Sequence, residues 1–176
     1  IIHPFDLRFS SAKTQIKWVN DLYIEGKKCA GILTEAGMDV ESGSVEWVII
    51  GIGVNCFLPQ GGFPAPLDQT ATAVWETPQM QRNALAAALI NEIAEQVLQL
   101  EQKNGSYDVY LEEYRRRSYL TGRAVRVYAA QPYDAICMGI DENGGLVVRC
   151  ENGESKTVIA GDVSVRATEN EKVQDR

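Results

Sequence analysis

Histidine is almost absent from this sequence, and cysteine is sparse. His3 stands alone, and the four cysteines, Cys29, Cys56, Cys137 and Cys150, form no CxxC pair and follow no regular spacing. Structural zinc sites draw most of their ligands from these two residue types. A lone histidine near a chain end is more often a solvated side chain, so we expect no metal site. With no secretory signal, reduced and buried thiols are the expected state of the cysteines.

Long apolar runs and excess positive charge are also missing. No segment approaches the roughly 18 apolar residues that a membrane span needs, and no signal peptide is visible. The net charge of −7 and the sequence pI near 4.8 argue against a nucleic-acid-binding surface. The 45% hydrophobic and 23% charged residues are ordinary for a globular protein. We expect a soluble, cytoplasmic protein with no nucleic-acid or membrane partner through this portion.

The most informative stretch runs from Lys17 to Glu35 and reads KWVNDLY, a turn, and then KKCAGILTE. Alternation in Gln15–Val19 and in Ala30–Leu33 predicts short strands, with Glu25–Gly26 as the turn between them. Asp21 and Lys28 would then lie on paired strands and could converge on one small polar ligand. A purely structural ion pair across the strands is the alternative that these residues leave open.

Glycines inside apolar runs mark places where a ligand can approach the backbone. Gly31 interrupts one such run, and it has no Cβ to block the approach. The stretch Ser44–Phe57 is nearly continuous in β-branched residues, which predicts a central strand buried on both faces. Gly51 and Gly53 alternate within it and present one bare, flat face. That face suits either a flat ligand or a helix packed on the sheet.

Helical patterns follow a loop at residues 58–70 that is rich in proline and glycine. A long helix is predicted from Gln79 or Asn83 to about Lys103, and a second helix over Ser106–Ser118. The second ends in Arg115-Arg116-Arg117, where cations favour the helix dipole. We expect a solvated helix end there, although a contact with phosphate or an acidic partner is the alternative.

From Thr121 onward the pattern is entirely β. Asn143-Gly144 and Asn152-Gly153 are strong signals for tight turns, and many short strands in so few residues predict a small barrel. The predicted domains are residues 1–120 and 121–168, followed by a disordered tail over 169–176. The predicted strands are Ala124–Tyr128, Tyr133–Ile140, Gly145–Cys150, Ser155–Ile159 and Val163–Arg166.

Three motifs in register resemble the biotin protein ligases. They are KWVNDLY at Lys17–Tyr23, KCAGILTE at Lys28–Glu35 and GIGVN at Gly51–Asn55. An Ala/Leu-rich helix and a terminal AGDVSVR segment at Ala160–Arg166 follow in the order that this family shows. The resemblance covers nearly the whole chain, from Ile16 to about Ala167.

The resemblance implies a mixed α/β catalytic domain similar to class II tRNA synthetase cores, followed by an SH3-like β-barrel. It implies that biotin and ATP, with Mg²⁺, give biotinyl-5′-AMP, and that the biotinyl group then passes to a lysine of the biotin carboxyl carrier protein of acetyl-CoA carboxylase. A homodimer is a further possible assembly. The implied catalytic residues are Lys28, which would contact the biotin carboxylate and the α-phosphate, and Asp21. The implied biotin contacts are Lys28, Gly31, Ile32, Gly51 and Gly53, and the implied ATP contacts are Lys17, Asn20 and Asn55.

Some features of the family are absent from this sequence. The glycine- and arginine-rich loop that folds over biotin, and the Ser/Thr pair before it, do not occur, and neither does a winged-helix DNA-binding domain. Ile1 to Leu7 lack an initiator Met and do not read as a natural start, and Val19 stands where proline is usual. We therefore expect little activity from this chain alone. A lipoate ligase relative and a non-catalytic dimerisation or carrier-docking module are the competing interpretations.

Overall fold

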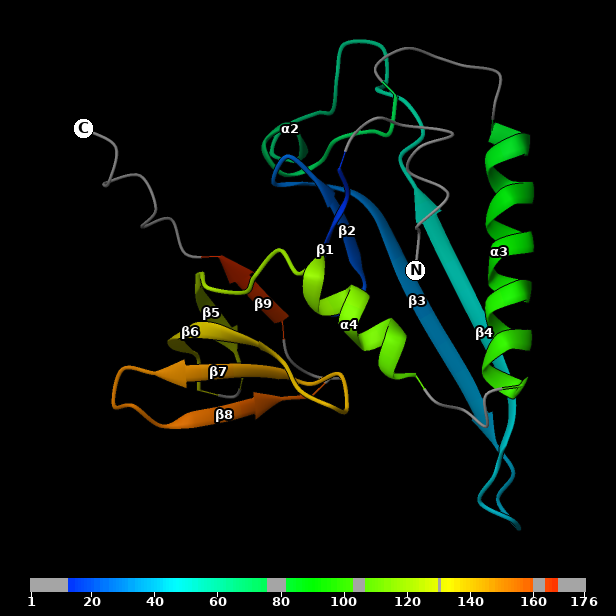
Figure 1. The fold of residues 1–176 in the computed structure, drawn as a ribbon. Helices are drawn as coiled ribbons and strands as arrows, with labels where there is room; N and C mark the ends of the chain where they lie inside the picture. Colours follow the sequence, from blue (N-terminus) through cyan, green and yellow to red (C-terminus); the bar gives the residue numbers. More distant parts are fainter. Residues whose placement is uncertain (1–12, 76–81, 103–106, 130, 160–163, 168–176) are drawn as a thin grey trace. The chain divides into compact units, whose positions relative to one another are not determined.

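The computed structural model describes residues 13–75, 82–102, 107–129, 131–159 and 164–167 (Figure 1). These residues form a mixed α/β fold with two antiparallel sheets, ordered β1-β2-β3-β4 and β8-β7-β6-β5-β9. None of the helices within these ranges is long and apolar enough to cross a membrane. The elements are β1 (Gln15–Lys17), β2 (Asp21–Ile24), β3 (Lys27–Met38), β4 (Val45–Val54), α2 (Leu67–Thr70), α3 (Arg82–Gln102), α4 (Asp108–Arg116), β5 (Ala124–Tyr128), β6 (Tyr133–Ile140), β7 (Leu146–Cys150), β8 (Ser155–Val158) and β9 (Ser164–Ala167).

The chain divides into two compact units. The first, here called the site unit, contains Asn20–Glu92 together with the segment that ends at Gln15. The second, here called the C-terminal unit, contains Ile93–Arg176 together with the short segment Ile16–Val19. The chain therefore passes from the C-terminal unit to the site unit between Val19 and Asn20.

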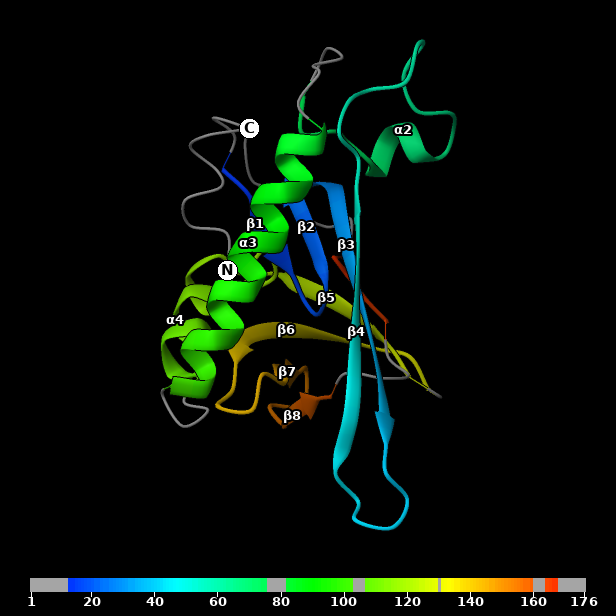
Figure 2. The same cartoon turned by 90° about the vertical axis from the view of Figure 1, so that its right-hand side faces the viewer.

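The predicted turn at Glu25–Gly26 is confirmed, and it joins β2 to β3. Both residues have positive φ, 50° and 78°, as a two-residue type I′ hairpin requires. β2 then pairs antiparallel with the first residues of β3. The remainder of β3 pairs with β4 as far as Met38, so β3 and β4 form a long hairpin that continues beyond β2 (Figure 2).

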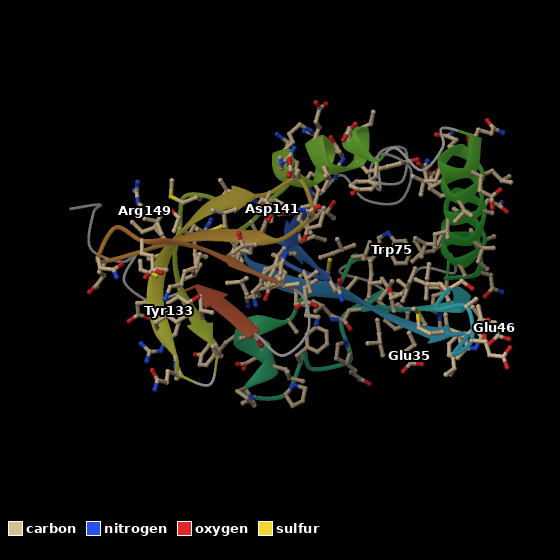
Figure 3. The ribbon with its side chains drawn as sticks, turned by 90° about the horizontal axis from the view of Figure 1, so that it is seen from below. Glu35, Glu46, Trp75, Tyr133, Asp141 and Arg149 are labelled. Carbon is tan, nitrogen blue, oxygen red and sulfur yellow. The ribbon has the colours of Figure 1, made fainter. Side chains whose placement is uncertain are left out.

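β4 is not the strand buried on both faces that its apolar sequence predicted. It stands last in its sheet, and its described partner is β3. Trp47 to Ile50 are between 46% and 56% exposed, and Figure 3 labels Glu35 and Glu46 on the same hairpin. An apolar run fits a doubly covered strand, but burial also requires a layer on each face. The described residues leave these side chains open.

The predicted long helix and the second helix are confirmed as α3 and α4, and the predicted bounds Gln79, Lys103 and Ser106 lie outside the described residues. The loop predicted at residues 58–70 is partly wrong, because it contains the single-turn helix α2. Asp68 stands in the first turn of α2, and its backbone carbonyl accepts a hydrogen bond from Lys27 Nζ at 2.8 Å. The β2–β3 turn region is thereby fastened to α2.

All five strands predicted after Thr121 are present, and tight turns with φ of 82° at Gly144 and Gly153 connect β6 to β7 and β7 to β8. Alternate side chains of β5, β6 and β7 are buried, as expected for strands with one covered face. The strand pairings run from β8 through β7, β6 and β5 to β9, and they do not join β8 directly to β9 within the described residues. The core of this sheet is formed by Leu120, Val125, Val127, Cys137, Leu146 and Val148, each at most 1% exposed.

Candidate functional site

Asp21 and Lys28 form an ion pair on one face of the first sheet. Lys28 Nζ lies 2.6 Å from Asp21 Oδ1, and the two side chains are 45% and 28% exposed. The prediction that these residues lie on paired strands is confirmed, because β2 pairs with β3. Both groups remain accessible to a ligand from solvent.

A β-bulge at Cys29 brings Lys28 to this face. Asp21 pairs with Gly31 and Leu22 with Ala30, but Tyr23 pairs with Lys28, so Cys29 is left without an opposite residue. In a regular ladder Lys28 would lie opposite Ile24 and point to the other face, away from Asp21. Bulges re-aim side chains in this way and are frequent beside functional sites. Sequence alternation alone did not reveal this bulge.

The Cys29 thiol helps to hold the bulge. Cys29 is 1% exposed, and its Sγ lies 3.3 Å from the carbonyl oxygen of Leu22. It packs with Ile24 and Ala30 in a small apolar cluster on the opposite face. The same irregularity therefore buries a thiol on one face and presents a cation on the other.

Gly31 leaves the space that the Lys28 side chain occupies. A Cβ built on Gly31 would lie 3.1 Å from both Cε and Nζ of Lys28 and 3.4 Å from Asp21 Oδ1. The ammonium therefore lies directly over the Gly31 backbone. Gly31 pairs with Gly53 on β4, so the ion pair borders the strand that carries the alternate glycines.

The glycine face continues from Gly31 across β4. Gly53 stands opposite Gly31, and Gly51 opposite Leu33, so all four residues belong to one face. Gly51 and Gly53 are exposed, and Leu33 is 64% exposed. Leu33 is a candidate ligand contact that sequence reasoning missed. Because it lies two residues after Gly31 in the same strand, its side chain is on the same face of the sheet.

Ile32 belongs to the opposite face. It pairs with Ile52, and its side chain alternates with the Gly31 position, so it lies on the apolar side. Its backbone N–H donates to the carbonyl oxygen of Asn20 at 2.9 Å. The Ile32 side chain therefore does not share the face that carries Gly31.

Asn55 supports the site from behind. Its Nδ2 atom donates to the carbonyl oxygen of Thr72 at 3.0 Å and lies 3.5 Å from the carbonyl oxygen of Lys28. The backbone N–H of Thr72 donates to the same Lys28 carbonyl at 2.9 Å. The amide therefore ties the strand that carries Lys28 to the segment around Thr72.

The other two residues implied in ATP binding lie near the beginning of the motif. Asn20 is exposed next to Asp21, where the chain returns to the site unit. Lys17 is half-buried in β1 and belongs to the C-terminal unit. Among the described residues, no cluster of three His, Cys, Asp or Glu side chains has a metal-binding arrangement.

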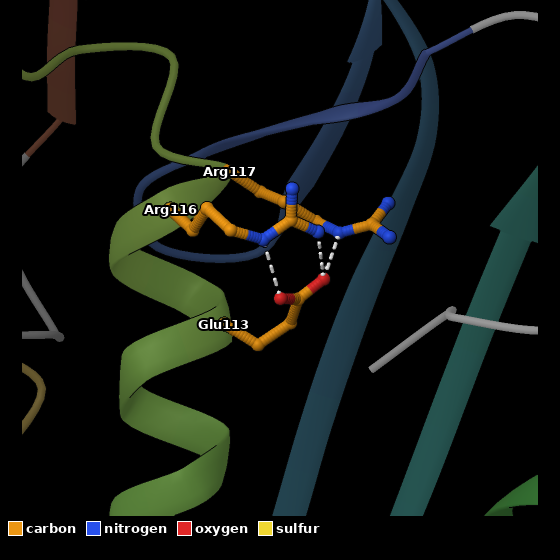
Figure 4. A network of polar contacts seen from close by, with 3 residues as sticks. All are labelled: Glu113, Arg116 and Arg117. Atoms are coloured by element: carbon orange, nitrogen blue, oxygen red, sulfur yellow. Dashed lines mark hydrogen bonds and ion pairs between the residues drawn. The ribbon is translucent and has the colours of Figure 1, made fainter.

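The arginine triplet is only partly the solvated helix end that the sequence predicted, because Arg115 and Arg116 are exposed whereas the Arg117 side chain is 13% exposed. Arg116 Nε donates to Glu113 Oε2 at 2.7 Å, and Arg117 pairs with the other carboxylate oxygen of Glu113 (Figure 4). Arg115 donates to the backbone carbonyls of Ile140 and Asp141 at 2.8 and 2.7 Å. The hydrogen bonds from Arg116 and Arg117 lower the pKa of Glu113 to about 2. These three cations are occupied by contacts within the chain.

Two family models match the chain. Residues 6–55 match the Biotin/lipoate A/B protein ligase family, and residues 120–166 match the Biotin protein ligase C terminal domain. The first range contains Asp21, Lys28 and the glycine strand through Asn55. The second contains the strands β5 to β8 and much of β9.

Sequence relatives extend this likeness over most of the chain. The Bifunctional ligase/repressor BirA of Escherichia coli is 29% identical over 168 residues, which are 92% of this chain and 49% of that protein. The Biotin–[acetyl-CoA-carboxylase] ligase of Mycobacterium tuberculosis is 31% identical over 156 residues, 86% of this chain and 53% of that protein. The chain thus spans about half the length of these relatives.

Solved structures share the fold. The apo biotin protein ligase from Aquifex aeolicus has a TM-score of 0.71 at 22% identity, over 90% of this chain and 67% of that one. The same enzyme in complex with biotin and ATP has a TM-score of 0.70 at 22% identity, over 90% and 64%. The two-sheet α/β architecture described above is therefore similar to that of biotin ligases.

Proposed function

Because the chain belongs to the biotin protein ligase family, we propose that its site serves the ATP-dependent attachment of biotin to a carrier protein. In the first step a biotin carboxylate oxygen attacks the α-phosphorus of ATP and pyrophosphate leaves, which gives biotinyl-5′-AMP. In the second step a carrier lysine attacks the biotinyl carbonyl and AMP leaves. The observation that carries this proposal is the Lys28–Asp21 pair on the glycine face.

Lys28 is proposed to neutralise the reacting anions. A carboxylate and a phosphate must meet in the first step, and a fixed ammonium group lowers the cost of bringing them together. Lys28 Nζ is held 2.6 Å from Asp21, yet its side chain is 45% exposed. It can therefore donate to an incoming oxygen while it keeps its partner. A compact ammonium has three donors, enough for such sharing.

Asp21 is proposed to act on the carrier lysine in the second step. That lysine is protonated at neutral pH, and it must lose a proton before its nitrogen can attack. The Asp21 carboxylate lies beside the position proposed for the reacting carbonyl, so it can hold the amine and accept its proton. Positioned general bases typically contribute about 10² to 10⁴-fold in rate.

The glycine face is proposed to receive the biotin ring system and chain. Gly51 and Gly53 leave their part of this face bare, beside the Lys28 side chain that lies over Gly31, and a flat bicyclic acid needs such a surface. Ile32 is proposed to border biotin through its backbone, because its side chain lies on the opposite face. Leu33 adds an exposed apolar contact beside Gly51.

The nucleotide side is proposed to include Lys17, Asn20 and Asn55. Asn20 is exposed next to Asp21. The Asn55 amide nitrogen donates to a backbone carbonyl, which leaves the amide oxygen as the atom proposed to face ATP. Mg²⁺ would accompany ATP through phosphate oxygens and water, its usual ligands in such sites.

The remaining features of the proposal concern the whole protein. We propose a domain boundary near residue 120 and an SH3-like closure of the C-terminal strands. We also propose a cytoplasmic location, a homodimer, and a carboxyl carrier protein as the partner. The match of residues 120–166 to the ligase C-terminal domain supports biotin over lipoate as the substrate acid. The 176 residues taken alone are proposed to have little activity, because they contain no Gly/Arg-rich biotin loop.

Biotin transfer to a carboxyl carrier domain tests this function. The complete natural protein, with ATP, Mg²⁺ and biotin, is expected to biotinylate one carrier lysine, and Lys28→Ala is expected to abolish adenylate formation. Lipoate offered in place of biotin should give no product. Adenylate formation at the normal rate by Lys28→Ala would refute the role of Lys28, and near-normal turnover by the 176-residue chain would refute its proposed impairment. Binding of the carrier without any binding of biotinyl-5′-AMP would indicate a docking module instead.

A further inference from the structure

Trp18, three residues before Asp21, is part of the core of the C-terminal unit. Its side chain is 5% exposed and packs in the same apolar cluster as Leu120 and Val125. Its indole Nε1 donates to the backbone carbonyl of Gly144 at 2.9 Å, in the turn between β6 and β7. A buried indole N–H needs such a partner, and this one fixes the orientation of the ring.

The neighbouring backbone is held in the same unit. The hydroxyl of Tyr114 donates to the carbonyl oxygen of Val19 at 2.9 Å. Burial raises the pKa of Tyr114, so its hydroxyl stays protonated and available as a donor at neutral pH. Ile16 adds two backbone hydrogen bonds, to the Arg117 carbonyl and from the Tyr119 N–H, both 2.8 Å. The segment Ile16–Val19 is therefore fixed at three successive places.

The β6–β7 turn that receives Trp18 is itself rigidly built. The carboxylate Oδ1 of Asp141 accepts from the backbone N–H groups of Asn143 and Gly145, both at 2.8 Å. Arg115 donates to the carbonyls of Ile140 and Asp141 at the same turn. Figure 3 labels Asp141 just past the end of β6 and Tyr133 at its start. Trp18 is thus anchored to a turn that has several independent restraints.

From these contacts we propose that Trp18 and Tyr114 are positioning residues, through which the C-terminal unit fixes the chain that enters the site. Val19 ends the short segment Ile16–Val19 of that unit, and Asn20 and Asp21 follow directly. The Val19 carbonyl is bound to Tyr114, and the Asn20 carbonyl is bound to the Ile32 N–H at 2.9 Å. The peptide before Asp21 is thereby held on both sides. The effect on ligand binding rests on the proposed function, whereas the anchoring itself does not.

Tyr114→Phe and Tyr133→Phe form a matched pair for the test. Both tyrosines pack against the same apolar cluster, and of the two hydroxyl groups that of Tyr114 is the one that donates to the Val19 carbonyl. Hydrogen exchange of the Ile32 amide reports on the Asn20 end of the segment without any ligand. Loss of one such hydrogen bond is expected to speed this exchange about 3- to 10-fold in Tyr114→Phe. Tyr133→Phe is expected to stay within about twofold of the unaltered protein.

Binding of biotinyl-5′-AMP to the complete natural protein provides the second measurement. Tyr114→Phe is expected to weaken this binding about 3- to 10-fold, because the same hydrogen bond is lost. Tyr133→Phe is expected to leave the affinity unchanged. Trp18→Phe, which keeps an aromatic ring but removes the N–H donor, should act in the same direction. Unchanged exchange in Tyr114→Phe overturns the anchor, and faster exchange with unchanged affinity overturns its positioning role. Absence of binding by the unaltered protein instead refutes the proposed function, and the exchange result still decides the anchor.

Discussion

The ammonium group of Lys28 lies over the backbone of Gly31, where a side chain on residue 31 would begin. The built Cβ of Gly31 would be 3.1 Å from Lys28 Nζ. The absence of one methyl group therefore allows the cation to reach Asp21 across the strand. This packing can be altered by one carbon atom without removing either charged group.

We expect Gly31→Ala to disturb Lys28 while leaving the fold intact. The new methyl group meets the flexible end of a half-exposed lysine, which can move by a few tenths of an ångström. Affinity for biotinyl-5′-AMP should fall about tenfold, equivalent to roughly 1.4 kcal/mol, while the melting temperature changes by no more than about 3 °C. Calorimetric titration and thermal denaturation measure the two quantities.

Gly53→Ala tests the role of the glycine face without altering the packing around Lys28. The nearest atom to its built Cβ is the Gly31 carbonyl oxygen at 4.0 Å, an ordinary contact. The protein should therefore lose no stability, but biotin binding should weaken about tenfold because the methyl group occupies the bare face. Unaltered affinity for biotin in Gly53→Ala would mean that biotin does not lie on this face.

Asp21→Asn should affect the transfer step more than the fold. The substitution keeps the size of the side chain and removes its charge and its basicity. A partly exposed ion pair contributes at most about 1 kcal/mol, so stability should change little. The single-turnover rate of transfer from biotinyl-5′-AMP to the carrier lysine should fall about 10² to 10⁴-fold. A transfer rate within a factor of a few of the original would contradict the role of Asp21.

Asn55→Asp should destabilise the site unit. The change removes the N–H donor to the Thr72 carbonyl at 3.0 Å and places a carboxylate against two carbonyl oxygens. The free energy of unfolding should fall by about 1 to 3 kcal/mol, which denaturant titration measures. Asn152→Asp is the matched control, because Asn152 donates at 3.4 Å to Glu154 in an exposed turn. Equal effects of the two changes would show that Asn55 has no supporting role.

Glu113→Gln should make stability less dependent on pH. Its pKa falls from 4.5 to about 2 on folding, chiefly through hydrogen bonds from Arg116 and Arg117. A carboxyl with a lowered pKa in the folded state stabilises above pH 4.5, and that contribution is lost as the pH falls toward 2. The variant should therefore be less stable by roughly 1 to 2 kcal/mol at pH 7, with the difference vanishing near pH 2. A difference that persists undiminished at pH 2 would exclude charge as its cause.

Much of the fold follows from local sequence signals. Glu25-Gly26, Asn143-Gly144 and Asn152-Gly153 marked turns that the structure contains, because positive φ in short hairpins demands such residues. The helical spacing of apolar residues in α3 and the alternation of apolar residues in β5 and β6 also predicted these elements correctly. Strand alternation and the turn also placed Asp21 and Lys28 on paired strands correctly. These features depend on neighbouring residues, which the sequence displays.

The errors concern features that depend on distant parts of the chain. The exposure of β4 depends on which layers cover it, and these layers cannot be predicted from the composition of β4 itself. The Cys29 bulge reverses the facing of Lys28, yet no residue type in the segment marks it. The partners of Arg115, the carbonyls of Ile140 and Asp141, lie 25 and 26 residues further along the chain. These hydrogen bonds could not be predicted from the number of charges at the helix end.

Titration of biotinyl-5′-AMP against Lys28→Met and Lys156→Met tests the central claim most directly. Both lysines are half-exposed, at 45% and 43%, and both pair with a carboxylate, Asp21 and Glu154. In the complete natural protein, Lys28→Met should weaken binding about 10- to 100-fold, as expected for lost hydrogen bonds to charged groups, while Lys156→Met should leave it unchanged. Equal affinity in the two variants would contradict the assignment of Lys28 to the reacting anions.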